Sequence, residues 1–190
     1  MQMGTNHVGH ALLAKLLLPA LSQDTETKDK RIVVVSSQGY SLSRGIDYSI
    51  LKTDGSKKNM LGGTQMLYSD SKLANVYFAQ QLAAHHPTIT TVSVHPGIVA
   101  TGLVSSQSKF SRSVIAIAAK FQQEGAKMLT QDQGAFNSLW AATVDKKQLR
   151  SGGYYEVVGV GGKENSMAKD KKASEKLWEW TMEELKDWSL

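Results

Sequence analysis

The chain has 190 residues with a net charge of +5, and 41% of its residues are hydrophobic while 21% are charged, a balance that predicts one globular domain with a real hydrophobic core. It contains no cysteine, which excludes disulfides, thiolate metal sites and cysteine nucleophiles. Its basic residues are scattered and no recognised nucleic-acid-binding motif accompanies them, so we expect no nucleic-acid partner.

The first predicted helix begins with Thr5 or Asn6 as its cap and continues to about Leu21. Its apolar run lacks a basic leader and is too short to span a bilayer, so we expect neither a secretory signal nor a transmembrane segment. A cytoplasmic location is the expectation, with peripheral association with an intracellular membrane left open. His7 and His10 have no convincing third ligand, so packing is predicted for them and no metal site is expected.

A run of β-branched residues, 31–35, predicts a strand that is buried on both faces of a parallel sheet. Ser36 and Ser37 follow it, and then comes a loop of about thirty residues, a length that is usually functional. A helix is predicted from Tyr68 to about His85 on its apolar periodicity, and a second strand over residues 90–95 ends at Pro96 and Gly97.

The remaining elements complete an alternation of strands and helices. Helices are predicted over 111–119 and 131–144, a third strand over 154–158 and an amphipathic helix over 171–188. This alternation favours an open, doubly wound α/β fold with a parallel sheet. In such a sheet the ligand lies beyond the carboxyl ends of the strands, where Ser37, Tyr68 and the Pro96-Gly97 pair converge.

Tyr68 and Lys72 lie four residues apart, so on a helix both side chains face the same spot. A phenol titrates near ~10, and a neighbouring cation favours the phenolate and lowers that pKa. A tyrosine prepared in this way can exchange a proton with an alcohol or carbonyl oxygen. The same spacing recurs at Tyr48 and Lys52, but there it falls in a loop-like segment, and we interpret that copy as structural.

Four motifs in a fixed order resemble the short-chain dehydrogenase/reductase family. The sequence is similar, more narrowly, to its retinol-dehydrogenase-like and WW-domain-oxidoreductase-like branch. The motifs are Asn6-His7-Val8-Gly9-His10, Val35-Ser36-Ser37, Tyr68-Ser69-Asp70-Ser71-Lys72-Leu73-Ala74-Asn75 and His95-Pro96-Gly97, with a terminal Lys176-Leu177-Trp178-Glu179.

The resemblance implies a role for each matching residue. Tyr68 would be the acid/base, and Lys72 would lower its pKa and bind the nicotinamide ribose. Ser37 would position the substrate oxygen, and Asn6 would hold the water of a proton relay.

The resemblance also implies a cofactor, NAD(P), with NADP slightly favoured. The segment that begins at Pro96 and Gly97 would line the nicotinamide. Within it, the Val99 backbone would lie at the carboxamide and Thr101 near the phosphates. The substrate would be an alcohol or carbonyl of a small or lipid-like apolar molecule.

The glycine-rich turn that binds the pyrophosphate in this family does not occur before Asn6. The stretch 159–163 does not fit its pattern, and we interpret it as a tail loop. We therefore expect residues 1–190 to form a single partial Rossmann-type domain that lacks its first strands. Its strand 31–35 would then lie at a sheet edge, which invites pairing with another chain.

Three functions remain open at this point. The first is an NAD(P)-dependent oxidoreductase that interconverts an alcohol and a carbonyl. The second is a truncated, catalytically silent relative that acts as a binding or oligomerisation partner, either of itself or of a full-length paralogue. The third, a basic-surface binding module, ranks last because no motif supports it.

Overall fold

The computed structural model describes residues 2–52, 63–99 and 128–188. Its main sheet has the strand order β1-β2-β5-β6. The strands β1, β2 and β5 run parallel, whereas β6 pairs antiparallel with β5. Their bounds are Arg31–Val35 for β1, Thr90–Val94 for β2, Tyr154–Glu156 for β5 and Val160–Gly161 for β6.

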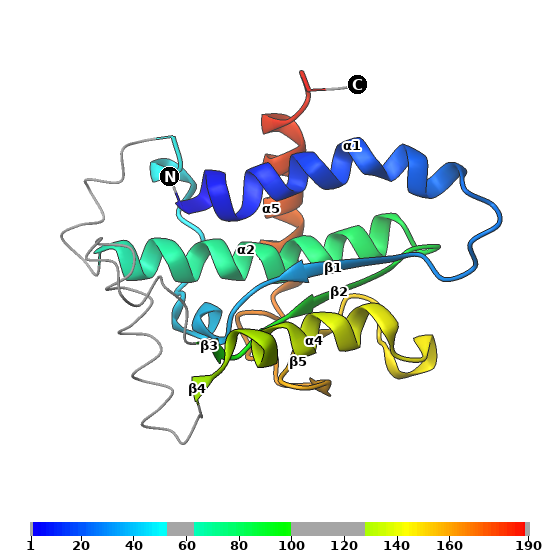
Figure 1. Cartoon of the computed structure of the whole chain (residues 1–190). Coiled ribbons are helices and arrows are strands. Elements are labelled where there is room, and N and C mark those ends of the chain that lie inside the picture. The colour runs from blue at the N-terminus through cyan, green and yellow to red at the C-terminus, as the bar shows by residue number, and fades with distance from the viewer. Residues whose placement is uncertain (1, 53–62, 100–127, 189–190) are drawn as a thin grey trace.

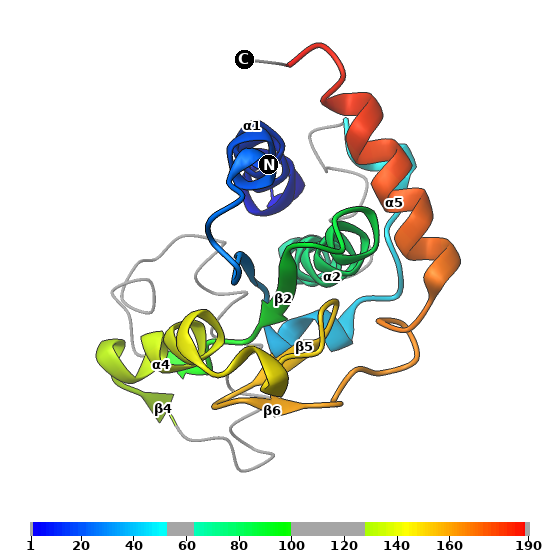
Figure 2. The same cartoon turned by 90° about the vertical axis from the view of Figure 1, so that its right-hand side faces the viewer.

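Helices cover both faces of this sheet. On one face lie α1 (Gly9–Gln23), α2 (Gly63–His85) and α5 (Lys171–Glu184), and on the other lies α4 (Gln131–Thr143) (Figures 1 and 2). A second, two-stranded ladder joins β3 (Ile98–Val99) to β4 (Met128–Leu129) beside α4. The predicted α/β class with a parallel sheet is confirmed.

The core forms because successive residues of a strand face opposite sides. Val34 of β1 packs with Ala11 of α1 and Phe78 of α2, whereas Val33 packs with the group that includes Trp140 of α4. All five residues of β2 are buried. The strand β2 is therefore covered on both faces, whereas the prediction that residues 31–35 are buried on both faces is not borne out along β1, in which only Val34 is buried and Val35 is 41% exposed.

Two predicted helix starts are wrong. The first helix has no cap at Thr5 or Asn6, because residues Gly4–Val8 form a π-helical turn that continues directly into α1. Likewise, α2 begins at Gly63, so Tyr68 lies inside the helix and not at its start. By contrast, α4 has a well-defined N-terminal cap, because Thr130 and Gln133 each accept the backbone N–H of the other in a capping box.

Other predictions differ in extent. The segment 36–52, predicted as loop, contains two short 3₁₀ helices, Gln38–Leu42 and Tyr48–Ile50, and a third, Lys146–Gln148, follows α4. The last helix ends at Glu184, so Trp188 lies beyond it and is exposed. The predicted helix over 111–119 lies outside the described residues.

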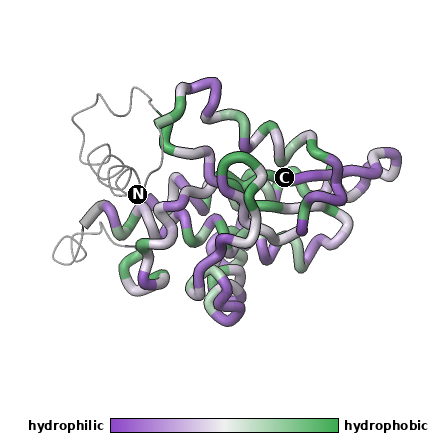
Figure 3. The backbone as a smooth tube through the Cα atoms, turned by 90° about the horizontal axis from the view of Figure 1, so that it is seen from below, coloured by the Kyte–Doolittle hydropathy of each residue, from purple (hydrophilic) through white to green (hydrophobic). Residues whose placement is uncertain are grey.

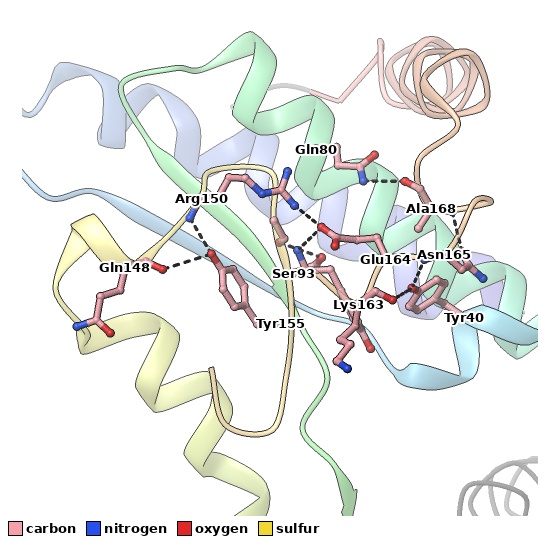
Figure 4. A network of polar contacts seen from close by, with 12 residues as sticks. Tyr40, Gln80, Ser93, Gln148, Arg150, Tyr155, Lys163, Glu164, Asn165 and Ala168 are labelled. Carbon is pink, nitrogen blue, oxygen red and sulfur yellow. Dashed lines mark hydrogen bonds and ion pairs between the residues drawn. The ribbon is translucent and has the colours of Figure 1, made fainter. Parts of the chain in front are cut away.

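A polar network holds the segment after β6 against the sheet and α2 (Figure 4). The carboxylate of Glu164, a buried residue, pairs with the Arg150 guanidinium and accepts from the Tyr154 backbone N–H. Gln80 of α2 donates to the Ala168 carbonyl at 2.9 Å. The stretch 159–163, predicted as a tail loop, is thus part of a hairpin with β5 whose far end is fixed to the core.

Hydrophilic and hydrophobic segments alternate along the chain (Figure 3), as expected where each element buries one side. In the part of the chain that the structure describes, no helix combines the length and apolarity that a membrane span requires. A groove of about 650 Å³ separates α1 from β1 and is mostly apolar, with Leu13, Leu17 and Val35 in its lining.

Candidate active site

The candidate site lies at the carboxyl end of β1, where α2 passes over it. The Ser36 N–H donates to the Val94 carbonyl of β2 at 2.8 Å, and the Ser36 hydroxyl donates to the Lys72 carbonyl of α2 at 2.7 Å. Ser36 is buried, so these two bonds fix where the strand end meets the helix. This contact determines how close the following Ser37 lies to the polar face of α2.

Three predicted residues meet here: Ser37, Tyr68 and Lys72. The Tyr68 phenol interacts with Ser37 through a side-chain hydrogen bond. The Lys72 ammonium lies 5.7 Å from the centre of the Tyr68 ring, as expected for side chains one helical turn apart. A hydroxyl, a phenol and an ammonium therefore converge on one spot, which is the donor set that a developing alkoxide requires.

The electrostatics of Tyr68 differ from the prediction. The sequence predicts that Lys72 lowers the pKa of Tyr68, but the net shift of that pKa is upward. Burial raises the pKa of Tyr68 because it desolvates the phenolate, and the hydrogen bond with Ser37 lowers it by less. At neutral pH the phenol is therefore protonated and can act as a proton donor.

Lys72 is half-buried, and burial lowers its pKa from 10.5 to about 8. Its ammonium donates to the Val35 carbonyl at 3.3 Å. His95, at the end of β2, is buried beside it, and burial together with the Lys72 charge lowers the pKa of His95 to about 4. The imidazole is thus neutral near pH 7 and adds no second positive charge to the site.

Two hydrogen bonds in series connect Asn6 to the backbone of Tyr68. Its side-chain amide donates to the Ser71 hydroxyl at 3.0 Å, and that hydroxyl donates to the Tyr68 carbonyl at 2.7 Å. Asn6 belongs to the π-helical turn before α1, and such turns often occur at functional positions. The structure therefore connects Asn6 to the backbone of α2, while its predicted role in a proton relay stays a prediction.

The segment predicted to line the nicotinamide follows β2, so it leaves the sheet at the same edge as Ser37. Gly97 has φ +89°, and a Cβ there would lie 2.5 Å from Leu129 Cδ1, so no other residue fits without a shift. Val99 lies in β3 and packs against Gly134 of α4. Pro96 joins the two strands, and Thr101 lies outside the described residues.

Two asparagines support the site although the sequence reasoning assigns no role to either; Asn75 ends one of the motifs named above, and Asn137 lies in none of them. Asn137 of α4 is buried, and its amide donates to the carbonyls of His95 at 2.7 Å and Tyr155 at 3.0 Å. Its oxygen accepts from the Gly159 N–H at 3.0 Å, so one side chain joins the ends of β2 and β5. Asn75 of α2 donates to the Val35 carbonyl at 3.0 Å. The sequence feature that could have identified both asparagines is a polar residue on an otherwise apolar helix face.

The second Tyr-x-x-x-Lys copy is remote from this chemistry. Tyr48 packs against Trp180 with ring centres 6.0 Å apart, and Lys52 pairs with Glu184 at 2.8 Å. The described residues also hold no cluster of three or more metal-ligating side chains.

No protein-family model matches the chain. It is 35% identical over 181 residues to retinol dehydrogenase 11 of Homo sapiens, a match that covers 94% of this chain and 52% of that protein. It is 28% identical over 190 residues to a short-chain dehydrogenase/reductase of Armillaria gallica, covering 99% and 58%. Retinol dehydrogenase 14 of Homo sapiens is 42% identical over 105 residues, covering 54% and 29%. The chain thus spans little more than half the length of the curated relatives that it matches over nearly its whole length.

A solved structure of an uncharacterized protein from Mycobacterium Paratuberculosis has a similar fold. Its TM-score is 0.55 at 23% sequence identity, and the match covers 95% of this chain and 57% of that one. This likeness concerns the fold alone.

Proposed function

Because the chain belongs to the short-chain dehydrogenase/reductase family, in its retinol-dehydrogenase-like branch, we propose that it serves NAD(P)-dependent interconversion of an alcohol and a carbonyl. The substrate class that we propose is a small or lipid-like apolar molecule. The observation that carries the proposal is the convergence of Ser37, Tyr68 and Lys72 at the carboxyl end of β1.

In the direction of reduction, the protonated Tyr68 phenol gives its proton to the substrate oxygen as the carbonyl becomes an alcohol. The Ser37 hydroxyl donates a hydrogen bond to the same oxygen and holds it against the phenol. The remaining phenolate lies close to the Lys72 ammonium, which stabilises its negative charge. A dinucleotide, when bound, supplies or accepts the hydride.

The residues present fit the nicotinamide end of such a dinucleotide. Lys72 offers an ammonium for the ribose hydroxyls, and the segment Pro96–Val99 leaves the sheet beside it. The 190 residues contain no Gly-x-Gly-x-x-Gly motif for the pyrophosphate. We therefore propose that residues 1–190 form one partial Rossmann-type domain. NADP is slightly favoured as its cofactor by family resemblance. Asn6 would hold the water of the proton relay, and Thr101 would lie near the cofactor phosphates. A cytoplasmic location is part of the same proposal, with peripheral association with an intracellular membrane left open.

The direct test is reduction of all-trans-retinal by NADPH and by NADH with the purified chain, since several of its relatives are retinol dehydrogenases. Nucleotide-dependent turnover that requires Tyr68 is the expected result. Absence of turnover from a folded chain that binds neither nucleotide would contradict the proposal.

A second candidate is the catalytically silent binding or oligomerisation partner, which the groove between α1 and β1 supports. Among the described residues β1 has a neighbour, β2, on one side only, and Leu13 and Leu17 on α1 are 56% and 50% exposed. A free strand edge beside apolar side chains favours pairing with a second copy of the chain. Light scattering on the wild type and on Leu17→Glu tests this, because only a groove-mediated dimer would dissociate in the variant.

A further inference from the structure

Asn137 of α4 continues the hydrogen bonding between β2 and β5 at the point where β5 ends. The His95 N–H donates to the Tyr155 carbonyl at 2.9 Å. In a parallel pair the His95 carbonyl would next accept an N–H from two residues beyond Tyr155, but β5 ends at Glu156. The side chain of Asn137, which is fully buried, donates to the His95 carbonyl at 2.7 Å and accepts from the Gly159 N–H at 3.0 Å. A side-chain amide has the donor and acceptor of a peptide unit, so Asn137 takes the position of the next peptide of the strand.

The turn that follows β5 links Asn137 to Gly97. Trp140 packs on this turn next to the Asn137 bond, because a Cβ at Gly159 would lie 2.6 Å from Trp140 Cε2. Val157 of the same turn packs on Gly97, where an added Cβ would lie 3.1 Å from Val157 Cγ2. The turn that α4 holds therefore forms one wall against Gly97.

Gly134 lies one helical turn before Asn137 and meets the other end of the segment 95–99. Residues three apart on a helix share a face. A Cβ at Gly134 would lie 2.5 Å from Val99 Cγ2, so the Val99 side chain rests on the backbone of α4, which lies beside β3 in Figure 1. One face of α4 therefore holds His95 at the start of the segment and Val99 at its end.

The segment 95–99 begins where β2 meets the end of β1, beside Ser37. The Ser36 N–H donates to the Val94 carbonyl at 2.8 Å, so the residue before the segment is fixed next to the candidate site. In the proposed function this segment lines the nicotinamide. A backbone that is already held in place loses little conformational entropy when a ligand binds to it.

We propose that Asn137 and Gly134 are positioning residues for the cofactor. Asn137 bonds to the start of the segment 95–99, and Gly134 leaves room for its end. Together they preorganise the segment for the nicotinamide end of a dinucleotide. The effect on nucleotide affinity rests on the proposed function, whereas the hold on the segment does not.

The test compares Asn137→Ala with Gln80→Ala, a matched control on the opposite face of the sheet. Each variant loses a side-chain amide that donates to a backbone carbonyl, and for Gln80 this is the Ala168 carbonyl at 2.9 Å. Gly134→Ala is the second variant, because alanine favours a helix and the contact with Val99 opposes it. This second variant keeps the test decisive if Asn137→Ala does not fold.

Amide hydrogen exchange without nucleotide shows whether α4 holds the segment. The exchange rates of residues 97–99 are measured by NMR relative to those of β2, whose residues are all buried and report global unfolding. In Asn137→Ala and in Gly134→Ala we expect residues 97–99 to exchange about tenfold faster relative to β2, whereas Gln80→Ala should keep the wild-type ratio. An unchanged ratio in a folded Asn137→Ala protein, or in Gly134→Ala if the first variant does not fold, would overturn the proposal.

Nucleotide binding tests the consequence for the cofactor. We expect the Kd for NADPH or NADH to rise about tenfold in Asn137→Ala and in Gly134→Ala, since roughly one backbone residue must then be ordered on binding, and to stay within about twofold in Gln80→Ala. Where turnover is measurable, the nucleotide KM should rise while kcat stays, because Tyr68 and Lys72 are untouched. A purely structural loss would instead lower the folded fraction and with it the apparent kcat. Equal weakening in Asn137→Ala and Gln80→Ala, or wild-type affinity in both α4 variants, would overturn the proposal.

A wild-type chain that binds neither nucleotide would contradict the proposed function. In that case the exchange rates of residues 97–99 still decide whether α4 holds the segment, so the two failures are told apart.

Discussion

The ammonium of Lys72 lies 5.7 Å from the centre of the Tyr68 ring, one turn away on the same face of α2. This spacing gives the phenol a neighbouring cation without a direct ion pair. Burial keeps Tyr68 protonated at neutral pH, and burial also brings the pKa of Lys72 down to about 8. The pair is therefore arranged to stabilise a phenolate when it forms, while the resting state is a neutral phenol.

Replacing Tyr68 by Phe removes only the hydroxyl that would transfer the proton. We expect turnover to fall by about 100- to 10,000-fold, the usual contribution of a positioned acid or base, with the melting temperature nearly unchanged. The measurement is the initial rate of retinal reduction at saturating NADPH. Tyr48→Phe is the matched control, because Tyr48 has the same spacing to a lysine but packs on Trp180. Equal losses in the two variants would show that Tyr68 has no special role.

Stability should fall in mild acid because two buried histidines must gain a charge. The folded-state pKa of His7 and of His95 is about 4, below the ordinary value of 6.5. The two neutral imidazoles therefore leave the free energy of unfolding at its full value above pH 6.5. That free energy decreases as the pH falls from 6.5 toward 4, because the unfolded state binds protons more readily than the folded state. Each should account for roughly 2 kcal/mol of the loss between pH 7 and pH 4.5. Urea unfolding at both pH values measures this, and His95→Asn should show a shallower dependence than the wild type.

Asn137 should be the most sensitive polar residue of the sheet end. Replacing it by Ala removes the side-chain donor from the carbonyls of His95 and Tyr155 and the acceptor from the Gly159 N–H. The Tyr155 carbonyl still accepts from the His95 N–H. We expect a loss of about 2 to 4 kcal/mol in the free energy of unfolding, as is usual for unsatisfied buried groups. The Ser49 hydroxyl donates to the exposed Asp47, so Ser49→Ala should stay within about 0.5 kcal/mol of the wild type. Similar values for the two would refute the structural role.

Comparing Gly97→Ala with Gly45→Ala distinguishes the stability cost of backbone strain from the cost of steric crowding. Both have positive φ, +89° and +110°, but an added Cβ meets Leu129 at 2.5 Å only at Gly97. Gly45→Ala should cost about 1 kcal/mol from strain alone. Gly97→Ala should cost clearly more, and it should also weaken nucleotide binding because the segment beside the site must move. Chemical unfolding of both variants measures the difference, and equal costs would argue against close packing at Gly97.

The sequence predicts the elements that strong local patterns define. Residues 31–35 form β1 as expected, because a run of β-branched residues has few alternatives, and the helix over 131–144 is found as α4. The two-residue strands β3 and β4 are too short to show a period, so they were not predicted.

The candidate site is predictable in its residues but not in its electrostatics. Spacing alone places Tyr68 and Lys72 on one face, whereas the direction of the Tyr68 pKa depends on burial, which arises only when β1, α2 and the following loop pack together. Asn75 and Asn137 act on carbonyls that are distant in sequence, at Val35 and His95. No local pattern encodes such contacts.

The most direct test of the account is nucleotide binding to the purified chain, measured as the rise in melting temperature with increasing NADPH or NADH. We predict a saturable rise for the wild type and for Lys52→Met, whose lysine pairs with Glu184 away from the site. Lys72→Met should weaken the affinity about 10- to 100-fold, since a hydrogen bond from a charged donor is lost. A folded wild-type chain with no rise at millimolar nucleotide would contradict the assignment of Tyr68 and Lys72 to a working oxidoreductase site.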